Sequence, residues 1–375
     1  MKKICYFINS DWYFDLHWLE RAIAAKKNGY QVHIICRFNG DLFINKFDEL
    51  GFFCYPINLK ERSLSIFGFV FLIIKLLPIL KSINPDIIHS ITIKPIILGG
   101  IFSRLKKKAF VANIVGLGRV FSYDNYLYLL IRFFVIRIYR FIFKNQKSRI
   151  IFEHEFDKVS LSKYINFYHD QTQVIDGAGV DTALFPYKSE GKLNRPIVFF
   201  AGRMLKNKGL KTLVDIRKKL KLEGLAFDLI VAGIEVPDDP HSIPASLIKK
   251  WHEDGDISWL GTRNDIAELI DKSSIVALPT MYPEGVPRIL IEACAIGRPC
   301  IAYNSGGCKS IIEDGVTGFL VDKGNENAFE LKLKELLMNP ELRHELGKNG
   351  RALVAEKFSS KKVISRTLSV YYSLT

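Results

Sequence analysis

The 375-residue sequence has only six cysteines, and no two of them form a Cys-x-x-Cys pair. This argues against a disulfide scaffold or a zinc ribbon and suits a reducing compartment. The chain also lacks the composition of disordered, collagen-like or low-complexity proteins, because 48% of its residues are apolar and 25% are charged. Its length is typical of two globular domains of about 150–200 residues each.

No hydrophobic run is long enough to cross a bilayer comfortably. The longest, residues 65–80, contains Lys75 and Pro78 and predicts a helix that is either buried or interfacial. Near the amino terminus, two lysines precede an apolar run at residues 4–8. That run is too short for a secretory signal and predicts a buried strand.

Acidic residues are scarce in one segment of this basic chain, which has a formal net charge of +14. Residues 101–150 hold 11 basic residues and one acidic residue. Within them, 126–143 predicts a helix whose basic positions fall within an arc of about 140° and whose remaining positions are aromatic or aliphatic. Such a helix can lie on an anionic membrane, or it can be a core helix with one solvated basic face. We expect residues 101–149 to contact an anionic membrane surface, and we expect no nucleic-acid binding because no recognised motif for it is present.

Short apolar runs alternate with helical patterns in both halves of the sequence, which predicts an α/β fold with two doubly wound parallel sheets. Strands are expected at 4–8, 31–36, 53–57, 87–90, 110–114, 149–153, 172–175, 197–201, 227–232, 257–260, 275–279, 300–303 and 319–321. The predicted domains are residues 1–185 and 186–358, and a last helix in 359–375 could pack back on the first domain. Ligands of such sheets bind beyond the carboxyl ends of the strands, so we expect a site built from loops of both halves across a cleft.

A candidate phosphate site follows the predicted strand at 197–201. Gly202 lets the backbone turn, Arg203 and Lys208 supply two cations, and a helix begins near Gly209. Cations beside a helix start favour a diphosphate. The alternative is an ordinary basic loop between a strand and a helix.

A second candidate segment follows the strand at 275–279. Gly285 permits close backbone approach, and Pro287 suits the first turn of a helix that closes at Gly297. Glu284 precedes this helix and Glu292 lies within it, about 12 Å apart if the segment were wholly helical. Two carboxylates at that distance cannot form one acid–base pair, but they can bind two parts of an extended ligand. Spacing alone leaves open that both are ordinary surface residues.

Taken in order, these segments resemble the retaining glycosyltransferases of family 4. The resemblance covers the whole chain and is strongest over residues 197–322. It is carried by Glu284 and Glu292 with seven residues between them, by Gly202-Arg203 with Lys208-Gly209, by Gly306-Gly307, by residues 313–321 and by residues 174–185.

The resemblance implies the GT-B fold, two Rossmann-like domains facing across a cleft, with a nucleotide diphosphate sugar held mainly by the C-terminal domain. Arg203 and Lys208 would neutralise the diphosphate as catalytic residues, with Gly202 in the same loop. Glu284, the third catalytic residue, would hold the sugar together with the backbone of Gly285, Val286 and Pro287. Glu292 would accept hydrogen bonds from the ribose.

The resemblance also implies retention of anomeric configuration, with no cofactor and no metal. The Asp-x-Asp pattern at residues 254–256 precedes a predicted strand rather than following one, so we interpret it as an acidic turn.

The N-terminal half departs from the family pattern. The loop after the first strand, residues 9–14, has no glycine, and Gly116-Leu117-Gly118 stands where many members have a histidine that contacts the sugar. His89, expected at a strand end facing the cleft, and His17, expected at a helix start, are candidates for contact, although each could equally be structural. The full set of acceptor or cleft candidates is Asp11, His17, His89, Gly116, Gly118 and Arg119.

The resemblance extends to bacterial enzymes that assemble capsule, O-antigen, lipopolysaccharide or glycan-carrier oligosaccharides. It implies a UDP-linked hexose or N-acetylhexosamine as donor and a saccharide on polyprenyl (undecaprenyl) diphosphate as acceptor. The expected location is the cytoplasm, peripheral to the inner face of the cytoplasmic membrane. The alternatives are a non-catalytic sugar-nucleotide-binding partner, which should lose Glu284, Arg203 or Lys208, and a UDP-sugar 2-epimerase of the same fold, which should carry acidic and histidine residues for proton transfer.

Overall fold

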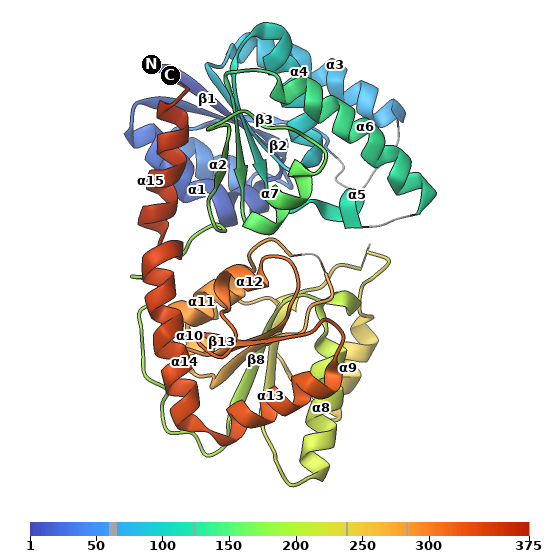
Figure 1. The fold of residues 1–375 in the computed structure, drawn as a ribbon, viewed down its shortest axis with the longest axis vertical. Helices are drawn as coiled ribbons and strands as arrows, with labels where there is room; N and C mark the ends of the chain where they lie inside the picture. The colour runs from blue at the N-terminus through green and yellow to red at the C-terminus, as the bar shows by residue number, and fades with distance from the viewer. Residues whose placement is uncertain (60–65, 123–124, 238, 283, 375) are drawn as a thin grey trace. The chain divides into compact units, whose positions relative to one another are not determined.

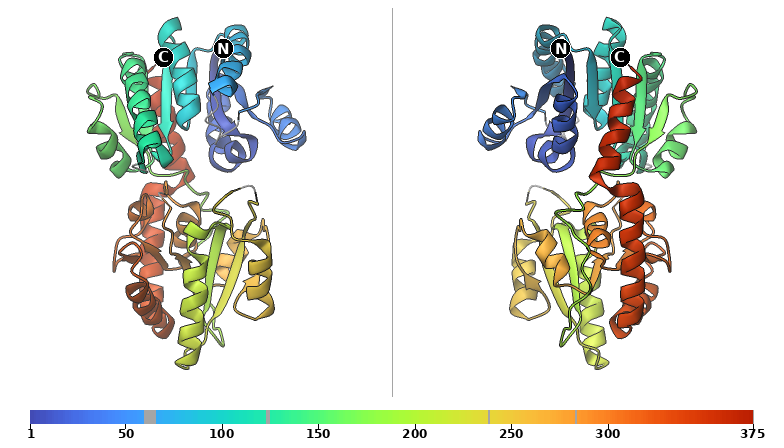
Figure 2. Two further views of the ribbon diagram at one scale, coloured as in Figure 1. Left: turned by 90° about the vertical axis from the view of Figure 1, so that its right-hand side faces the viewer. Right: turned by 90° about the vertical axis from the view of Figure 1, so that its left-hand side faces the viewer.

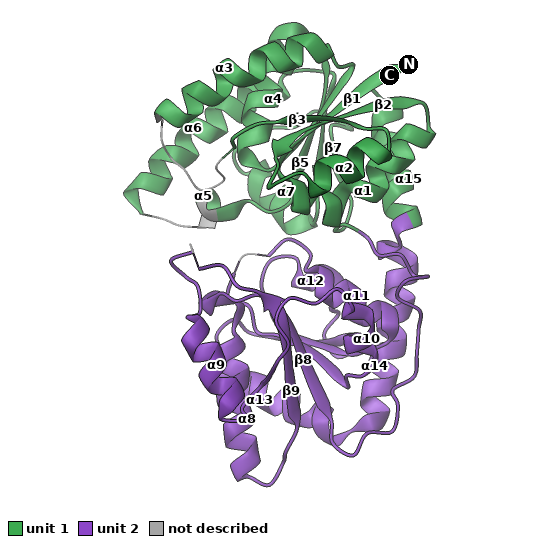
Figure 3. Cartoon of the chain, turned by 180° about the vertical axis from the view of Figure 1, so that it is seen from behind, with its two compact units in different colours: residues 1–178, 361–375 green, residues 179–360 purple. Residues whose placement is uncertain are grey.

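The computed structural model describes residues 1–59, 66–122, 125–237, 239–282 and 284–374 (Figure 1). They form two compact units (Figure 3): residues 1–178 with 361–375, and residues 179–360. The division falls at residue 178 rather than 185, because Val180 and Phe185 are buried in the core of the second unit.

In the first unit, the described residues form one parallel sheet in the order β3-β2-β1-β4-β5-β6-β7. Its strands are β1 (Lys2–Ser10), β2 (Tyr30–Arg37), β3 (Phe53–Pro56), β4 (Ile87–Ile91), β5 (Ala109–Ile114), β6 (Ser148–Phe152) and β7 (Thr172–Val174). The order reverses direction at β1, as in a doubly wound sheet. Buried apolar runs explain the central strands, since every residue of β4 and β5 is buried.

Helices cover both faces of this sheet. One face packs on α3 (Ile66–Ile83), α4 (Ile93–Lys106) and α6 (Tyr126–Phe143). The other packs on α1 (Asp11–Lys27), α2 (Leu42–Glu49) and α15 (Ser360–Tyr372), the last of which is red in Figure 2. The short helices α5 (Gly118–Ser122) and α7 (Glu155–Ser162) follow β5 and β6.

The second unit has a parallel sheet in the order β10-β9-β8-β11-β12-β13 among its described residues. The strands are β8 (Ile197–Arg203), β9 (Asp228–Ile234), β10 (Ser258–Trp259), β11 (Ile275–Leu278), β12 (Cys300–Tyr303) and β13 (Gly318–Val321). The α-helices are α8 (Leu210–Leu222), α9 (Ala245–Glu253), α10 (Ile266–Asp271), α11 (Arg288–Ile296), α12 (Cys308–Ile311), α13 (Glu326–Met338) and α14 (Pro340–Leu353). A 3₁₀ turn at Lys206–Lys208 and a π-helical turn at Val354–Phe358 complete the unit.

The two apolar segments that raised the question of a membrane are both helices. α6 has the predicted bounds, and α3 begins and ends close to its predicted run. Within the described residues, no helix combines the length and the apolar character needed to traverse a bilayer.

Candidate active site

The two candidate segments of the second unit lie side by side because β8 and β11 are neighbours in the sheet. The loop after β8 meets the loop after β11 directly, where the amide of Met281 donates to the carbonyl of Asn207 at 2.8 Å. A Cβ on Gly209 would lie 2.0 Å from the carbonyl oxygen of Pro279, and the φ of Gly209 is +85°. A glycine is therefore required for the phosphate-site loop to close against its neighbour.

Lys208 and Glu284 form an ion pair at this meeting point, with side chains only 12% and 10% exposed. The Thr280 hydroxyl, which is fully buried, donates to the same carboxylate at 2.8 Å. Sequence reasoning assigned Lys208 to the phosphates and Glu284 to the sugar separately. The fold brings them into direct contact, so a charged ligand here would meet a paired, mostly desolvated lysine and carboxylate.

Arg203 and Lys208 share an aromatic neighbour, Tyr282. The Arg203 guanidinium carbon lies 5.8 Å and the Lys208 ammonium 5.5 Å from the centre of the Tyr282 ring. A cation is attracted to the face of such a ring within about 6 Å. The two predicted phosphate ligands are therefore gathered around one side chain.

The glycine pair after β12 supports the segment around Glu284. The Gly307 amide donates to the Glu284 carbonyl at 3.0 Å. A Cβ at Gly306 would lie 2.2 Å from the Glu284 carbonyl oxygen, and one at Gly307 would lie 2.4 Å from the Gly285 carbonyl oxygen. Only glycines allow these two backbones to approach so closely.

Glu292 lies in α11 and is 7% exposed. Burial raises the pKa of its carboxyl, while Arg288, whose Nε donates to Oε1 at 2.6 Å, opposes that rise. α11 begins at Arg288, so Glu284 lies in the loop before the helix. There Glu284 pairs with Lys208, whereas Glu292 pairs with Arg288.

Two site residues were missed by sequence reasoning, Thr280 and Tyr282. Both lie inside the segment that was singled out, but threonine and tyrosine there carried no signal beyond loop composition. Their roles depend on which loop packs beside them, which the strand order decides.

Two family models match this chain. Residues 185–353 match the family described as glycosyl transferases group 1, and residues 3–154 match glycosyl transferase 4-like. The chain thus combines a glycosyl transferase 4-like domain with a group 1 glycosyl transferase domain. The predicted family and enzyme class are thereby confirmed.

Curated relatives of this glycosyltransferase include bacterial transferases. It is 28% identical over 349 residues, 88% of each chain, to N,N'-diacetylbacillosaminyl-diphospho-undecaprenol alpha-1,3-N-acetylgalactosaminyltransferase of Campylobacter jejuni. It is 29% identical over 175 residues, 47% of this chain and 45% of the relative, to the capsular polysaccharide biosynthesis glycosyltransferase CapM of Staphylococcus aureus.

Solved structures confirm the predicted GT-B fold. A glycosyltransferase from Rickettsia africae superposes with a TM-score of 0.79 at 20% identity, over 100% of this chain and 98% of the other. Anabaena HepE in complex with UDP superposes with a TM-score of 0.77 at 17% identity, over 100% of both chains.

Two predicted contact residues of the first unit of the glycosyltransferase are core residues instead. His89 lies inside β4, is fully buried and accepts or donates a 2.7 Å hydrogen bond between Nδ1 and the Tyr371 hydroxyl. Burial lowers its pKa well below the ordinary value, so the ring is neutral. Asp11 is also fully buried, and its carboxylate accepts from the amides of Trp12 and Asn39 at 2.8 and 2.7 Å.

The remaining candidates of that unit lie near strand ends. His17 is partly exposed in α1, with its ring centre 4.4 Å from that of Tyr13. Gly116 lines a cavity after β5, and Gly118 begins α5 with a φ of +60°. Arg119 lies in α5, and its side chain is outside the described part of the structure.

The Asp-x-Asp sequence is a turn after α9, and Asp256 pairs with Lys218 at 2.8 Å. Among the residues that the structure describes, no group of three or more His, Cys, Asp or Glu side chains could hold a metal ion.

Proposed function

We propose that this glycosyltransferase transfers a hexose or N-acetylhexosamine from a UDP-sugar, with retention of configuration, to a saccharide on polyprenyl diphosphate. The observation that carries the donor half of the proposal is the convergence of Lys208, Arg203 and Glu284 at one edge of the second sheet. UDP as the nucleotide is supported by the shared fold with HepE, whose structures hold UDP and UDP-glucose.

Each residue of the site has a distinct task in this proposal. Arg203 and Lys208 bind the diphosphate and stabilise the negative charge that grows on it as the glycosidic C–O bond breaks. Lys208 then exchanges part of its pairing with Glu284 for a phosphate oxygen. Glu284, still held by Thr280, accepts hydrogen bonds from the sugar, and the backbone of Gly285, Val286 and Pro287 lies against it. Glu292, oriented by Arg288, accepts from the ribose hydroxyls. None of these residues requires a metal ion.

The acceptor half of the proposal is supported by the Campylobacter relative, whose name specifies an undecaprenol-linked acceptor. It is also supported by the outer faces of α3 and α6. These faces expose large apolar side chains next to basic ones: Phe67, Phe71 and Ile74 on α3, and Tyr126, Leu127, Leu130, Phe133, Phe134 and Phe141 on α6. Arg137 lies over the Phe133 ring at 4.4 Å. We infer that these faces rest on an anionic membrane surface, at the cytoplasmic side where UDP-sugars are available.

The two alternatives predict different assays. A non-catalytic partner would bind the nucleotide sugar without turnover, and a 2-epimerase would release an epimerised sugar without any acceptor. The presence of Glu284, Arg203 and Lys208 in one site favours transfer over both.

The donor is tested with a panel of UDP-, GDP- and dTDP-sugars, read by thermal stabilisation and by transfer to synthetic polyprenyl-diphosphate saccharides. We expect a UDP-sugar to stabilise the protein, and we expect NMR to show that the product keeps the donor's anomeric configuration.

Arg203→Ala and Lys208→Ala should each weaken donor binding about tenfold or more, because each removes a charge-assisted hydrogen bond. Lys206→Ala, at an exposed position in the same turn, is the matched control. Stabilisation that survives both substitutions, or an inverted product, would contradict the proposal.

A further inference from the structure

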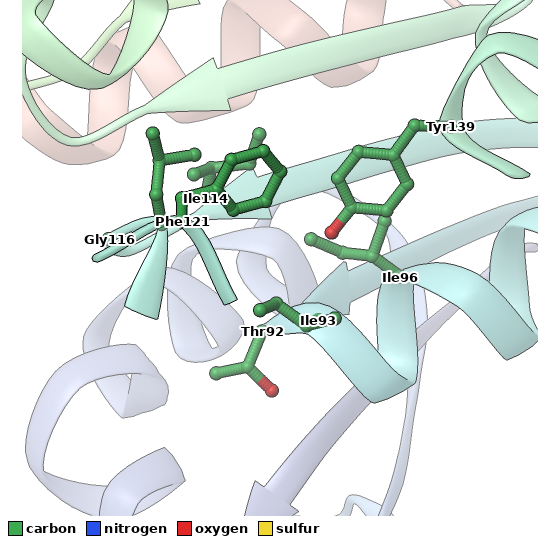
Figure 4. A pocket seen from close by; sticks show the side chains of 8 residues that line it. Thr92, Ile93, Ile96, Ile114, Gly116, Phe121 and Tyr139 are labelled. Atoms are coloured by element: carbon green, nitrogen blue, oxygen red, sulfur yellow. The ribbon is translucent and has the colours of Figure 1, made fainter. Parts of the chain in front are cut away.

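The helix α6 has two different faces. Its inner face is buried in the first unit, where Tyr139 of α6 and Ile96 of α4 line one small cavity (Figure 4). Its outer face carries large apolar side chains that are 43–55% exposed: Leu130, Phe133, Phe134 and Phe141. At 100° per residue, Arg137 falls in the middle of this exposed stripe. A cation therefore lies at the centre of an apolar surface.

The Arg137 side chain lies over the ring of Phe133, one turn earlier in the helix. Its guanidinium carbon is 4.4 Å from the ring centre, well within the range of a cation–π contact. Among the hydrogen bonds and ion pairs of the described residues, none involves the Arg137 side chain. The ring covers one side of the planar guanidinium and leaves its in-plane N–H donors available for an oxyanion.

α3 repeats this arrangement. The Lys75 ammonium lies 4.8 Å from the centre of the Phe71 ring, again with the phenylalanine four residues before the cation. Phe71 is 54% exposed. Helices α3 and α6 cover the same face of the sheet (Figure 1). One face of the first unit thus carries two cations, each held over an exposed phenylalanine.

The other two arginines of α6 bond within the fold. Arg132 Nε donates to the carbonyl of Val120 at 2.9 Å, which ties α6 to α5. Arg140 Nε and Nη2 both donate to the carbonyl of Tyr164, at 3.0 and 2.7 Å, which ties α6 to the segment after α7. The three arginines add equal charge to the helix, but their donors meet different partners.

We propose that Arg137 and Lys75 bind the phosphate groups of anionic bilayer lipids. Arg132 and Arg140 stabilise the fold instead. The apolar side chains around each pair enter the bilayer interface, which places the cation at the level of the lipid phosphates. There the guanidinium gives two parallel N–H···O bonds to one phosphate, and the ammonium gives a point-charge contact. This inference rests on the membrane contact of the proposed function and names the groups that make it.

The first experiment compares two charge removals on α6. Arg137→Gln and Arg140→Gln lower the net charge equally, and each is measured for binding to vesicles of phosphatidylcholine and phosphatidylglycerol and for melting temperature. We expect Arg137→Gln to weaken vesicle binding about tenfold, because charge-assisted hydrogen bonds to phosphate are lost, and to leave the melting temperature unchanged. Arg140→Gln should lower the melting temperature by about 2–4 °C, because its bonds to the Tyr164 carbonyl are lost.

Vesicle binding of Arg140→Gln should fall only about twofold, the effect of one screened charge. Equal loss of binding in the two arginine variants would show that net charge alone governs association, and it would overturn the proposal. Lys75→Gln and Lys81→Gln repeat the comparison on α3, where Lys81 lies in the last turn of the helix. Equal loss in those two variants would likewise overturn the assignment of Lys75.

The second experiment tests the ring beneath the cation. Phe133 and Phe134 are consecutive and 49% and 55% exposed, and among the described residues only Phe133 of the two lies under a cation. Phe133→Leu keeps an apolar side chain but removes the ring face. It should weaken binding to the same vesicles about threefold more than Phe134→Leu does. Equal effects of the two variants would overturn the pairing of cation and ring.

The outcomes separate this inference from the proposed function. If wild type binds the vesicles and Arg137→Gln and Arg140→Gln lose binding equally, the phosphate contacts are overturned and the proposed membrane face stands. If wild type binds no vesicles, both the membrane face and this inference are contradicted. Transfer from a UDP-sugar to a water-soluble acceptor, measured on wild type, reports on the donor half of the proposed function alone.

Discussion

Single residues decide how the charges of the proposed donor site are held. Glu284 is nearly buried, and its carboxylate has two partners: the Lys208 ammonium and the Thr280 hydroxyl. Thr280 also accepts from the Tyr282 amide at 3.1 Å. One hydroxyl therefore fixes both the carboxylate proposed to hold the sugar and the backbone that carries the aromatic ring beside the cations.

Thr280→Val tests this role with little change of shape. We expect kcat to fall about tenfold, because Glu284 loses one of its two bonds, and the free energy of unfolding to fall by about 1–3 kcal/mol, because the Tyr282 amide is left unpaired. Steady-state kinetics and urea unfolding measure the two effects. Thr212→Val, at a threonine that donates to Glu326 on the surface, is the control and should leave kcat unchanged. A normal kcat in Thr280→Val would contradict the positioning role.

Glu153, the residue after β6 in the first unit, predicts a pH dependence of stability. Burial raises the pKa of its carboxyl from 4.5 to about 7; the nearby Arg21, His154 and Asn113 oppose that rise, while Asp157 adds to it. The folded protein thus holds this proton more tightly than the unfolded chain does. The stabilisation from this group is complete below pH 4.5 and is lost as pH rises to about 7, on the order of 3 kcal/mol in all.

Glu153→Gln removes this titration. Urea unfolding at several pH values measures the free energy of unfolding of the variant and of wild type. As pH rises from 4.5 to about 7, the value for the variant should increase relative to that for wild type. Glu155→Gln, at an exposed carboxylate on α7, should follow the wild-type curve. Parallel curves for wild type and Glu153→Gln would show that Glu153 ionises normally.

At the scale of elements, α15 belongs to the core of the first unit although it ends the chain. Tyr371 is fully buried, and its hydroxyl lies 3.0 Å from the Tyr6 hydroxyl of β1 and 2.7 Å from His89 Nδ1 of β4. Val363 and Val370 are buried in the same apolar cluster. The helix thus completes one face of a sheet whose strands come from the opposite end of the sequence.

Tyr371→Phe should lower the free energy of unfolding by about 1–3 kcal/mol, because two buried polar groups lose their shared partner. Urea unfolding followed by circular dichroism measures the change. Tyr372→Phe is the matched control, since Tyr372 is 53% exposed and its hydroxyl donates to Asn28 at the surface. Equal stability of the two variants would mean that the Tyr371 hydroxyl contributes nothing to the core.

At the scale of the whole molecule, the positive charge and the exposed apolar surface both favour the proposed association with an anionic membrane. The chain carries a net charge of +14, and the helices of its most basic segment expose aromatic side chains. Positive charge attracts the protein to anionic lipid within about a Debye length, and the aromatic side chains then insert at the interface. Both contributions are needed for the proposed association, and they respond differently to salt.

Replacing Phe133 and Phe134 together by Glu should reduce co-sedimentation with phosphatidylglycerol-containing vesicles by about tenfold or more, because it removes two apolar side chains and adds like charge. High salt should release the wild type from vesicles without reducing transfer to a water-soluble acceptor. Phe156→Glu, at a 59% exposed phenylalanine on α7, is the control. Unchanged binding of the double variant would contradict the proposed membrane face.

The sequence could predict most elements because their signals are local. The bounds of α6 and α8 and the strand Cys300–Tyr303 follow from periodicity and glycine positions. The same reasoning erred on His89, which it placed at a strand end, because burial depends on helices packed from elsewhere in the chain. It also named Asp11 as a candidate for acceptor or cleft contact, whereas the buried carboxylate accepts a hydrogen bond from the amide of Asn39, which lies 28 residues away in sequence.

By itself the sequence determined the family and the two parallel sheets and predicted the donor-site residues, since these depend on motifs that are short and ordered along the chain. Only the tertiary structure decided that Lys208 and Glu284 pair and that Thr280 and Tyr282 support them. The physical reason is that strand order, not sequence distance, brings loops together, and a side chain's burial and charge state follow from those neighbours.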